Sequence, residues 1–177
     1  MRAPACYPAC SGERSDPIKT LLILRHAKAE PDAGAGDESR PLAKRGQRAA
    51  ERVGELLSDR LPELVLSSPS ARTRETVERF SKGAGMRARV EYVADLYLAS
   101  PATLLRVVAE HGGETQRVML VGHNPGLEDL VTRLSGEDVT LPTAGLAECE
   151  IEVERWSDVT LGTHVELVRL SYPRDDD

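Results

Sequence analysis

Two short apolar runs in this chain each stop at a histidine. Residues 20–24 (Thr-Leu-Leu-Ile-Leu) end at Arg25 and His26, and residues 117–121 (Arg-Val-Met-Leu-Val) are followed two positions on by His123. Short runs of leucine and β-branched residues are typical of buried strands. Ligands bind outside the carboxyl ends of strands in open α/β sheets. Both histidines are therefore candidate functional residues, although a histidine can also close a strand without any chemistry.

The rest of the chain alternates between strand-like and helix-like segments. Period-two and short apolar runs predict strands at residues 19–24, 63–67, 90–93, 117–121, 147–153 and 164–171. Helical spacing and flanking glycines predict helices at residues 43–60, 69–82, 101–110 and 125–134. This order indicates an α/β protein in which the last two strands alternate in the manner of antiparallel strands.

Two of the predicted helices begin directly after a strand. Ser68 and Asn124 are candidate N-caps, and Pro69 and Pro125 stand where proline is favoured, at the first helical position. Arg72 then falls in the first turn, beside free backbone N–H groups, which is a natural anion site. An ordinary capped helix with a solvated arginine would produce the same pattern.

Length and net charge limit the number of domains and the classes of partner that we expect. A chain of 177 residues with 40% hydrophobic content fits one domain with a sizeable core. We expect this domain at residues 18–174, after a flexible extension at residues 1–17. The net charge of −6 argues against a nucleic-acid partner or an acidic membrane surface. No apolar run approaches the roughly 20 residues that span a bilayer.

The three cysteines form no disulfide framework. Cys6, Cys10 and Cys149 are an odd number without framework spacing, so a reducing, cytoplasmic setting is expected. A metal site at Cys6 and Cys10 would need further ligands, and none is near in the sequence. We therefore predict neither a metal nor a cofactor.

Four segments together resemble the histidine phosphatase superfamily, the phosphoglycerate mutase-like proteins. The likeness is greatest to the short branch typified by the SixA phosphohistidine phosphatases, and it extends over residues 19–172. The motifs that carry it are Arg25-His26-Ala27, with alanine for the family's glycine; Arg40-Pro41-Leu42; Ser68-Pro69 with Arg72 and Thr76; and Gly122-His123-Asn124-Pro125. Each motif is weak alone, but their order and spacing match the family.

The resemblance implies both a fold and a chemistry. The fold is a three-layer α/β/α arrangement around a mostly parallel sheet with antiparallel C-terminal strands. His26 would attack phosphorus and form a phosphohistidine, while His123 contacts the phosphoryl oxygens. Arg25, Arg40 and Arg72 would bind the dianionic phosphoryl group, since a guanidinium makes paired, charge-assisted bonds. Like-charge repulsion from these arginines is expected to keep His26 unprotonated.

The sequence departs from mutase-type members at the general acid. Those members carry a glutamate in an insert after the third strand, whereas residues 92–100 here offer only Asp95, as an acid, a water-positioning group or an ordinary loop aspartate. A phosphorylated imidazole can leave as a neutral ring, so an acid-poor pocket favours phosphohistidine on a protein as substrate. The alternatives are a small-molecule phosphomonoesterase acting on sugar or nucleotide phosphates, and a non-catalytic phosphate-binding domain.

Overall fold

The computed structural model describes residues 18–31, 34, 36–85 and 89–172. The extension predicted at residues 1–17, with Cys6 and Cys10, lies outside these described residues.

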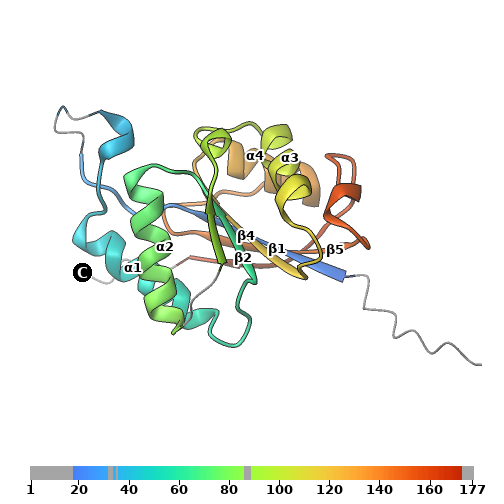
Figure 1. Cartoon of the computed structure of the whole chain (residues 1–177), viewed down its shortest axis with the longest axis horizontal. Coiled ribbons are helices and arrows are strands. Elements are labelled where there is room, and N and C mark those ends of the chain that lie inside the picture. Colours follow the sequence, from blue (N-terminus) through green and yellow to red (C-terminus); the bar gives the residue numbers. More distant parts are fainter. Residues whose placement is uncertain (1–17, 32–33, 35, 86–88, 173–177) are drawn as a thin grey trace, which may run out of the picture.

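A six-stranded mixed sheet forms the middle of the molecule (Figure 1). Its strands stand in the order β3-β2-β4-β1-β5-β6. The neighbouring pairs β3/β2, β2/β4 and β4/β1 are parallel, whereas β5 runs antiparallel to both β1 and β6. The bounds are β1 Ile18–Arg25, β2 Leu64–Ser67, β3 Arg89–Tyr92, β4 Arg117–Gly122, β5 Leu146–Glu152 and β6 Glu166–Ser171. The predicted α/β fold, with a mostly parallel sheet and antiparallel C-terminal strands, is confirmed.

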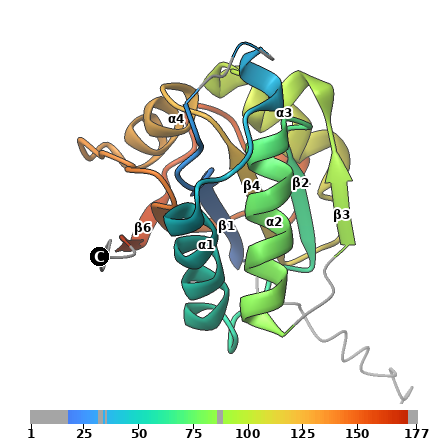
Figure 2. The same cartoon turned by 90° about the vertical axis from the view of Figure 1, so that its left-hand side faces the viewer.

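Helices cover both faces of this sheet. In Figure 2, α1 and α2 lie side by side in front of it, and Figure 1 shows α3 and α4 grouped away from them. The helices are α1 Lys44–Leu56, α2 Ala71–Ala84, α3 Pro101–His111 and α4 Gly126–Ser135, with short 3-10 turns η1 Asp37–Ser39, η2 Ala94–Leu96 and η3 Trp156–Asp158. The three predicted layers are therefore present.

The central strand β1 divides its side chains between two hydrophobic cores. Leu22 and Leu24 pack into the core under α1 and α2. Leu21 and Ile23 pack into the core under α3 and α4. Successive side chains of a strand point to opposite faces, so a continuous apolar run is what a strand buried on both faces requires.

The parallel register brings the carboxyl ends of β1, β2 and β4 to one edge of the sheet. Arg25, the last residue of β1, pairs with Gly122, the last residue of β4. Ser67, the last residue of β2, pairs with Val121 of β4. The residues that follow these strands, His26 among them, therefore emerge side by side.

Two predicted helix caps are wrong. Helix α2 begins at Ala71 with Ser70 as its N-cap residue, and α4 begins at Gly126 after Pro125. The Ser68 hydroxyl lies 2.9 Å from Nε2 of His123 instead, and the Asn124 amide donates to the carbonyl of Leu141. Both polar side chains take partners distant in sequence because the strands place those partners beside them.

Candidate active site

His26 presents one unprotonated ring nitrogen. Its Nδ1 lies 2.8 Å from the carbonyl oxygen of Ala27. A carbonyl oxygen only accepts hydrogen bonds, so Nδ1 carries the proton and the lone pair of a neutral ring is on Nε2. The amide of Ala27 in turn donates to the Thr76 hydroxyl over 3.0 Å, which fixes this turn to helix α2. The alanine in place of the family's glycine is fully buried and packs in the core under α1 and α2.

The surroundings of His26 favour the neutral ring. Burial is the largest cause that lowers the pKa of His26 to about 4; the Ala27 carbonyl opposes this shift, and the charges of Arg72, Arg25 and Arg40 add to it. Charge repulsion by the arginines was expected from the sequence. The structure adds burial as the larger cause.

His123 is held between a serine and an arginine. Its Nδ1 lies 3.2 Å from Nη2 of Arg72, and its Nε2 lies 2.9 Å from the Ser68 hydroxyl. Arginine has no acceptor, so Nδ1 is unprotonated and a neutral His123 donates through Nε2 to Ser68. Burial, followed by the charge of Arg72, lowers the pKa of His123 to about 3. The ring centre lies 5.3 Å from that of His26.

Arg72 is the buried cation of the site. Its side chain is only 4% exposed, on the first turn of α2. Besides its contact with His123, Nη1 donates to the backbone oxygen of Asp37 and Nη2 to the Asp37 carboxylate, over 2.5 and 2.8 Å. As predicted, Arg72 lies at the start of a helix, where it contacts His123.

Arg25 and Arg40 stand around His26 as the sequence predicted. Arg25 donates through Nη1 to the carbonyl of Leu141 over 2.8 Å, and its buried Nε has no partner among the described residues. Arg40 donates through Nε to the carbonyl of Glu30 and through Nη1 to the Asp37 carboxylate. Both guanidinium groups are close enough to His26 to lower its pKa.

Sequence reasoning missed Asp37 and Tyr97. The Asp37 carboxylate accepts from Tyr97 over 2.7 Å as well as from Arg40 and Arg72. These donors, Tyr97 first, hold the pKa of Asp37 well below its usual range. The Tyr97 ring also meets the ring of His123 edge-on at 5.2 Å. The one sequence signal for Asp37 was its place just before the Arg40 motif.

Asp95 pairs with an arginine on α3 and not with the groups around His26. Its carboxylate accepts from Nη2 of Arg106 on α3 over 2.6 Å, and 58% of its side chain is exposed. No contact of Asp95 with His26 or His123 is found in the described part of the chain. Its role as a general acid stays a prediction.

Of the two glycines that flank His123, Gly126 is required for packing. A Cβ on Gly126 would lie 1.9 Å from the carbonyl oxygen of Ala99, and one on Gly122 would be in ordinary contact with Leu127. The absence of a side chain at Gly126 thus seats α4 against the segment that follows Tyr97.

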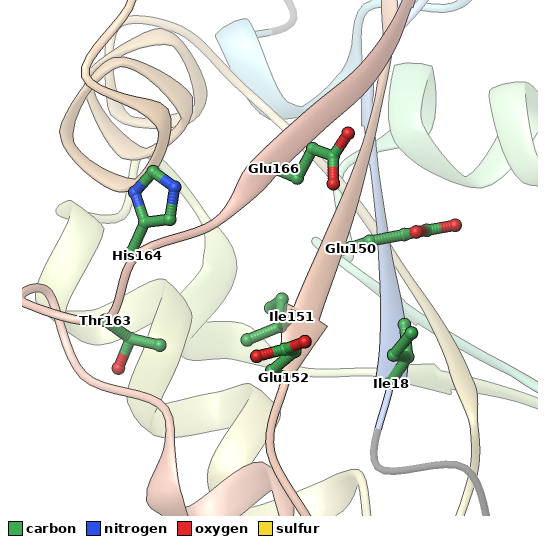
Figure 3. Close-up of a pocket in the computed structure, with 7 residues that line it drawn as sticks. All are labelled: Ile18, Glu150, Ile151, Glu152, Thr163, His164 and Glu166. Carbon is green, nitrogen blue, oxygen red and sulfur yellow. The ribbon is translucent and has the colours of Figure 1, made fainter.

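A separate cavity lies at the opposite end of β1. It has a volume of about 560 Å³, begins at Ile18 and is lined by Glu150, Glu152, Glu166 and His164 (Figure 3). Figure 3 shows the glutamates on the two antiparallel strands, β5 and β6. Three carboxylates repel a phosphoryl dianion, so this cavity is not a second phosphate site.

Two further findings concern metals and membranes. Within the described ranges, no group of three or more histidine, cysteine, aspartate or glutamate side chains is placed to hold a metal ion. No helix in the same ranges is long and apolar enough to cross a membrane.

Known proteins share this arrangement. Residues 21–97 match the model of the histidine phosphatase superfamily (branch 1). Rv1276c, an uncharacterized protein of Mycobacterium tuberculosis strain H37Rv, is 32% identical over 164 residues, which cover 85% of this chain and 100% of that protein. The chain belongs to the histidine phosphatase superfamily, branch 1. The resemblance inferred from four short motifs is thereby confirmed.

Solved structures of this superfamily have the same fold. The crystal structure of SixA from Agrobacterium tumefaciens is 31% identical, covers 88% of this chain and 98% of its own, and superposes with a TM-score of 0.74. The protein histidine phosphatase SixA in complex with tungstate is 22% identical over 87% of this chain and 97% of its own, with a TM-score of 0.70. The second likeness concerns the fold alone.

Proposed function

We propose that this protein is a metal-independent phosphatase that forms a phosphohistidine at Nε2 of His26 and acts on phosphohistidine carried by a protein. The observation that carries the proposal is the hydrogen bond from His26 Nδ1 to the Ala27 carbonyl. This bond leaves the Nε2 lone pair free in a ring that burial and three arginines keep neutral. A neutral, oriented nitrogen among fixed positive charges is what nucleophilic attack on a phosphoryl dianion needs.

The reaction has two steps. The Nε2 lone pair of His26 forms a bond to phosphorus, and the bond from phosphorus to the leaving nitrogen of the substrate breaks. The leaving imidazole keeps that electron pair and departs as a neutral ring if solvent has protonated its other nitrogen. A water oxygen then attacks phosphorus, the bond to His26 breaks, and phosphate is released with the proton of water passing to solvent.

The arginines do the electrostatic work of this reaction. Arg25, Arg40 and Arg72 bring three permanent positive charges around His26. Preorganised charge of this kind stabilises the phosphoryl oxygens in the transition state and is the usual main contribution to phosphoryl transfer. His123 accepts from Arg72 and thereby orients it. Contact of His123 with the phosphoryl oxygens remains a prediction from the family.

The choice of a phosphohistidine substrate is supported by the state of two loop carboxylates. Asp37 accepts hydrogen bonds from two arginines and a tyrosine, and Asp95 accepts from Arg106. Asp37 is a poor proton donor because these donors hold its pKa well below its usual range, and Asp95 makes no contact with either site histidine in the described part of the chain. An alkoxide leaving group needs a general acid, whose contribution is about 10²–10⁴-fold, whereas a protonated phosphoimidazole does not. The similar SixA structure from Agrobacterium tumefaciens carries the name of a phosphohistidine phosphatase, which supports the same substrate here.

The test is a side-by-side turnover assay in the presence of EDTA. The substrates are a phosphohistidine-bearing protein, a sugar phosphate and 3-phosphoglycerate. Rapid release of phosphate from phosphohistidine alone supports the proposal. Preference for an alkyl phosphate would move the function to a small-molecule phosphomonoesterase, and loss of all activity with EDTA would contradict the metal-independent mechanism.

A further inference from the structure

The anion-binding groups of the site already hold an anion that belongs to the chain. The two carboxylate oxygens of Asp37 accept from Arg72 at 2.8 Å, from Arg40 at 2.9 Å and from Tyr97 at 2.7 Å. The backbone oxygen of Asp37 accepts from Nη1 of the same Arg72. Two guanidinium groups around two anionic oxygens are the surroundings that a bound phosphoryl group would have.

A phosphoryl group at His26 would require the same donors. Both terminal nitrogens of Arg72 are engaged, Nη1 with Asp37 and Nη2 with Asp37 and His123. The terminal Nη1 of Arg40 also goes to Asp37, while its Nε is bound to a backbone carbonyl. A dianion arriving at these groups would meet the negative charge of Asp37 at contact distance. The two anions therefore exclude each other unless Asp37 moves.

Asp37 can leave the arginines without disturbing the core. Its side chain is 48% exposed, and none of the three residues of turn η1 is buried. The turn follows Gly36, whose φ of 92° lies in the region that favours glycine. Water can solvate the released carboxylate. Arg72, in contrast, is 4% exposed and stays in place.

We propose that Asp37 is an internal competitor for the phosphoryl group, displaced from Arg72 and Arg40 when substrate binds and returning as phosphate leaves. Asp37 thereby sets the affinity of the site: it weakens binding of phosphate, keeps the arginines paired in the empty site and limits product inhibition. This inference rests on the proposed function only in assuming that the phosphoryl group binds at Arg72 and Arg40.

The test measures binding of inorganic phosphate by titration calorimetry, with EDTA present and no turnover. Asp37→Asn keeps the size of the side chain and removes its charge. The apparent Kd of a site equals its intrinsic Kd divided by the fraction that is free to bind. Relief of the competing ion pairs should therefore lower the Kd for phosphate by about five- to tenfold. The KM of Asp37→Asn for the phosphohistidine substrate should fall together with this Kd. Its kcat should not exceed that of the wild type, because phosphate leaves more slowly.

Two further variants make the test specific. Glu38→Gln removes the same charge one residue further along the turn and should leave the Kd for phosphate unchanged, since its carboxylate is not one of the groups found on Arg72 or Arg40. Tyr97→Phe removes one of the donors that hold Asp37 and should lower the Kd by about two- to threefold.

A role of Asp37 in orienting the arginines would change the Kd for phosphate in the opposite direction. If Asp37 stays in place and orients the arginines for the anion, Asp37→Asn will raise the Kd for phosphate and the KM together. An unchanged or raised Kd in Asp37→Asn, an equal gain in Glu38→Gln, or no phosphate binding to any variant would overturn the proposal. Tight phosphate binding with no hydrolysis of phosphohistidine would instead support it and contradict the proposed function.

Discussion

Arg72 and His123 are joined by a hydrogen bond in which the histidine is the acceptor. The distance from Nη2 to Nδ1 is 3.2 Å, and the other ring nitrogen of His123 lies against Ser68. Burial, followed by repulsion from the charge of Arg72, lowers the pKa of His123 and keeps its ring neutral. The neutral ring therefore acts as a support that aims the buried guanidinium.

Arg72→Lys should cost far more activity than its conserved charge suggests. The guanidinium makes three hydrogen bonds, to His123 and to two oxygens of Asp37, in a fixed planar geometry. A lysine ammonium cannot reach these positions together. We expect kcat/KM to fall by about a hundredfold, corresponding to the loss of one or more charge-assisted bonds. Arg79→Lys on the same helix, which pairs with Glu51, is the matched control and should leave kcat/KM unchanged. Wild-type kinetics in Arg72→Lys would remove Arg72 from the site.

His26→Ala should abolish turnover without unfolding the protein. The substitution removes the nucleophile from the edge of the sheet, while the fully buried side chains beside it in β1 remain. We expect a loss of about a hundredfold or more in kcat and no alkali-stable phosphoryl label on the protein after quenching. The control is His164→Ala, at the far end of the sheet. This variant should keep full activity and the phosphoryl label. Persistence of the label in His26→Ala would contradict the covalent mechanism.

Acid should destabilise the protein through these two histidines. The folded state lowers the pKa of His26 to about 4 and that of His123 to about 3, from 6.5 in the unfolded chain. Between these values the unfolded state binds more protons, so the free energy of unfolding is fully present above about pH 6.5 and falls as pH drops toward 4. Each histidine contributes a slope of about 1.4 kcal/mol per pH unit in that range.

Urea unfolding at several pH values between 4 and 7.5 measures this slope. His26→Ala should reduce it by the contribution of one histidine, and His164→Ala should not change it. Equal slopes in wild type and His26→Ala would show that His26 has an ordinary pKa in the folded protein.

The sequence predicted the elements of this fold because each rests on local patterns. The strand that ends at Arg25 is a continuous apolar run, and α3 begins after Ser100, an N-cap whose hydroxyl accepts from the amide of Thr103. The site histidines were found because parallel strands bring their carboxyl ends to one edge. Their order and spacing then matched a family.

The roles that the sequence did not predict belong to side chains whose partners are distant in sequence. Ser68 was predicted as an N-cap because it stands just before a helical pattern. Its hydroxyl instead lies within hydrogen-bond distance of His123, 55 residues away. Asp37 is joined to Arg72 across 35 residues and to Tyr97 across 60. Neither contact leaves a period or a motif in the sequence. The sequence therefore gave no role to Asp37, although its carboxylate accepts from Arg40 and Arg72 in the site.

Asp95→Asn should change turnover of phosphohistidine by no more than about threefold, because the carboxylate it removes is exposed and tied to Arg106. The assay should include an alkyl phosphate, since only an alkoxide leaving group depends strongly on a proton donor. Arg106→Gln is the companion variant, because it frees the carboxylate while leaving it in place. If Asp95 is the acid, Asp95→Asn will lower kcat for the alkyl phosphate by about 10²–10⁴-fold and Arg106→Gln will shift the acidic limb of its pH profile. If the site is acid-poor, as we expect, neither variant will do so, and the preference for phosphohistidine will follow from the leaving group itself.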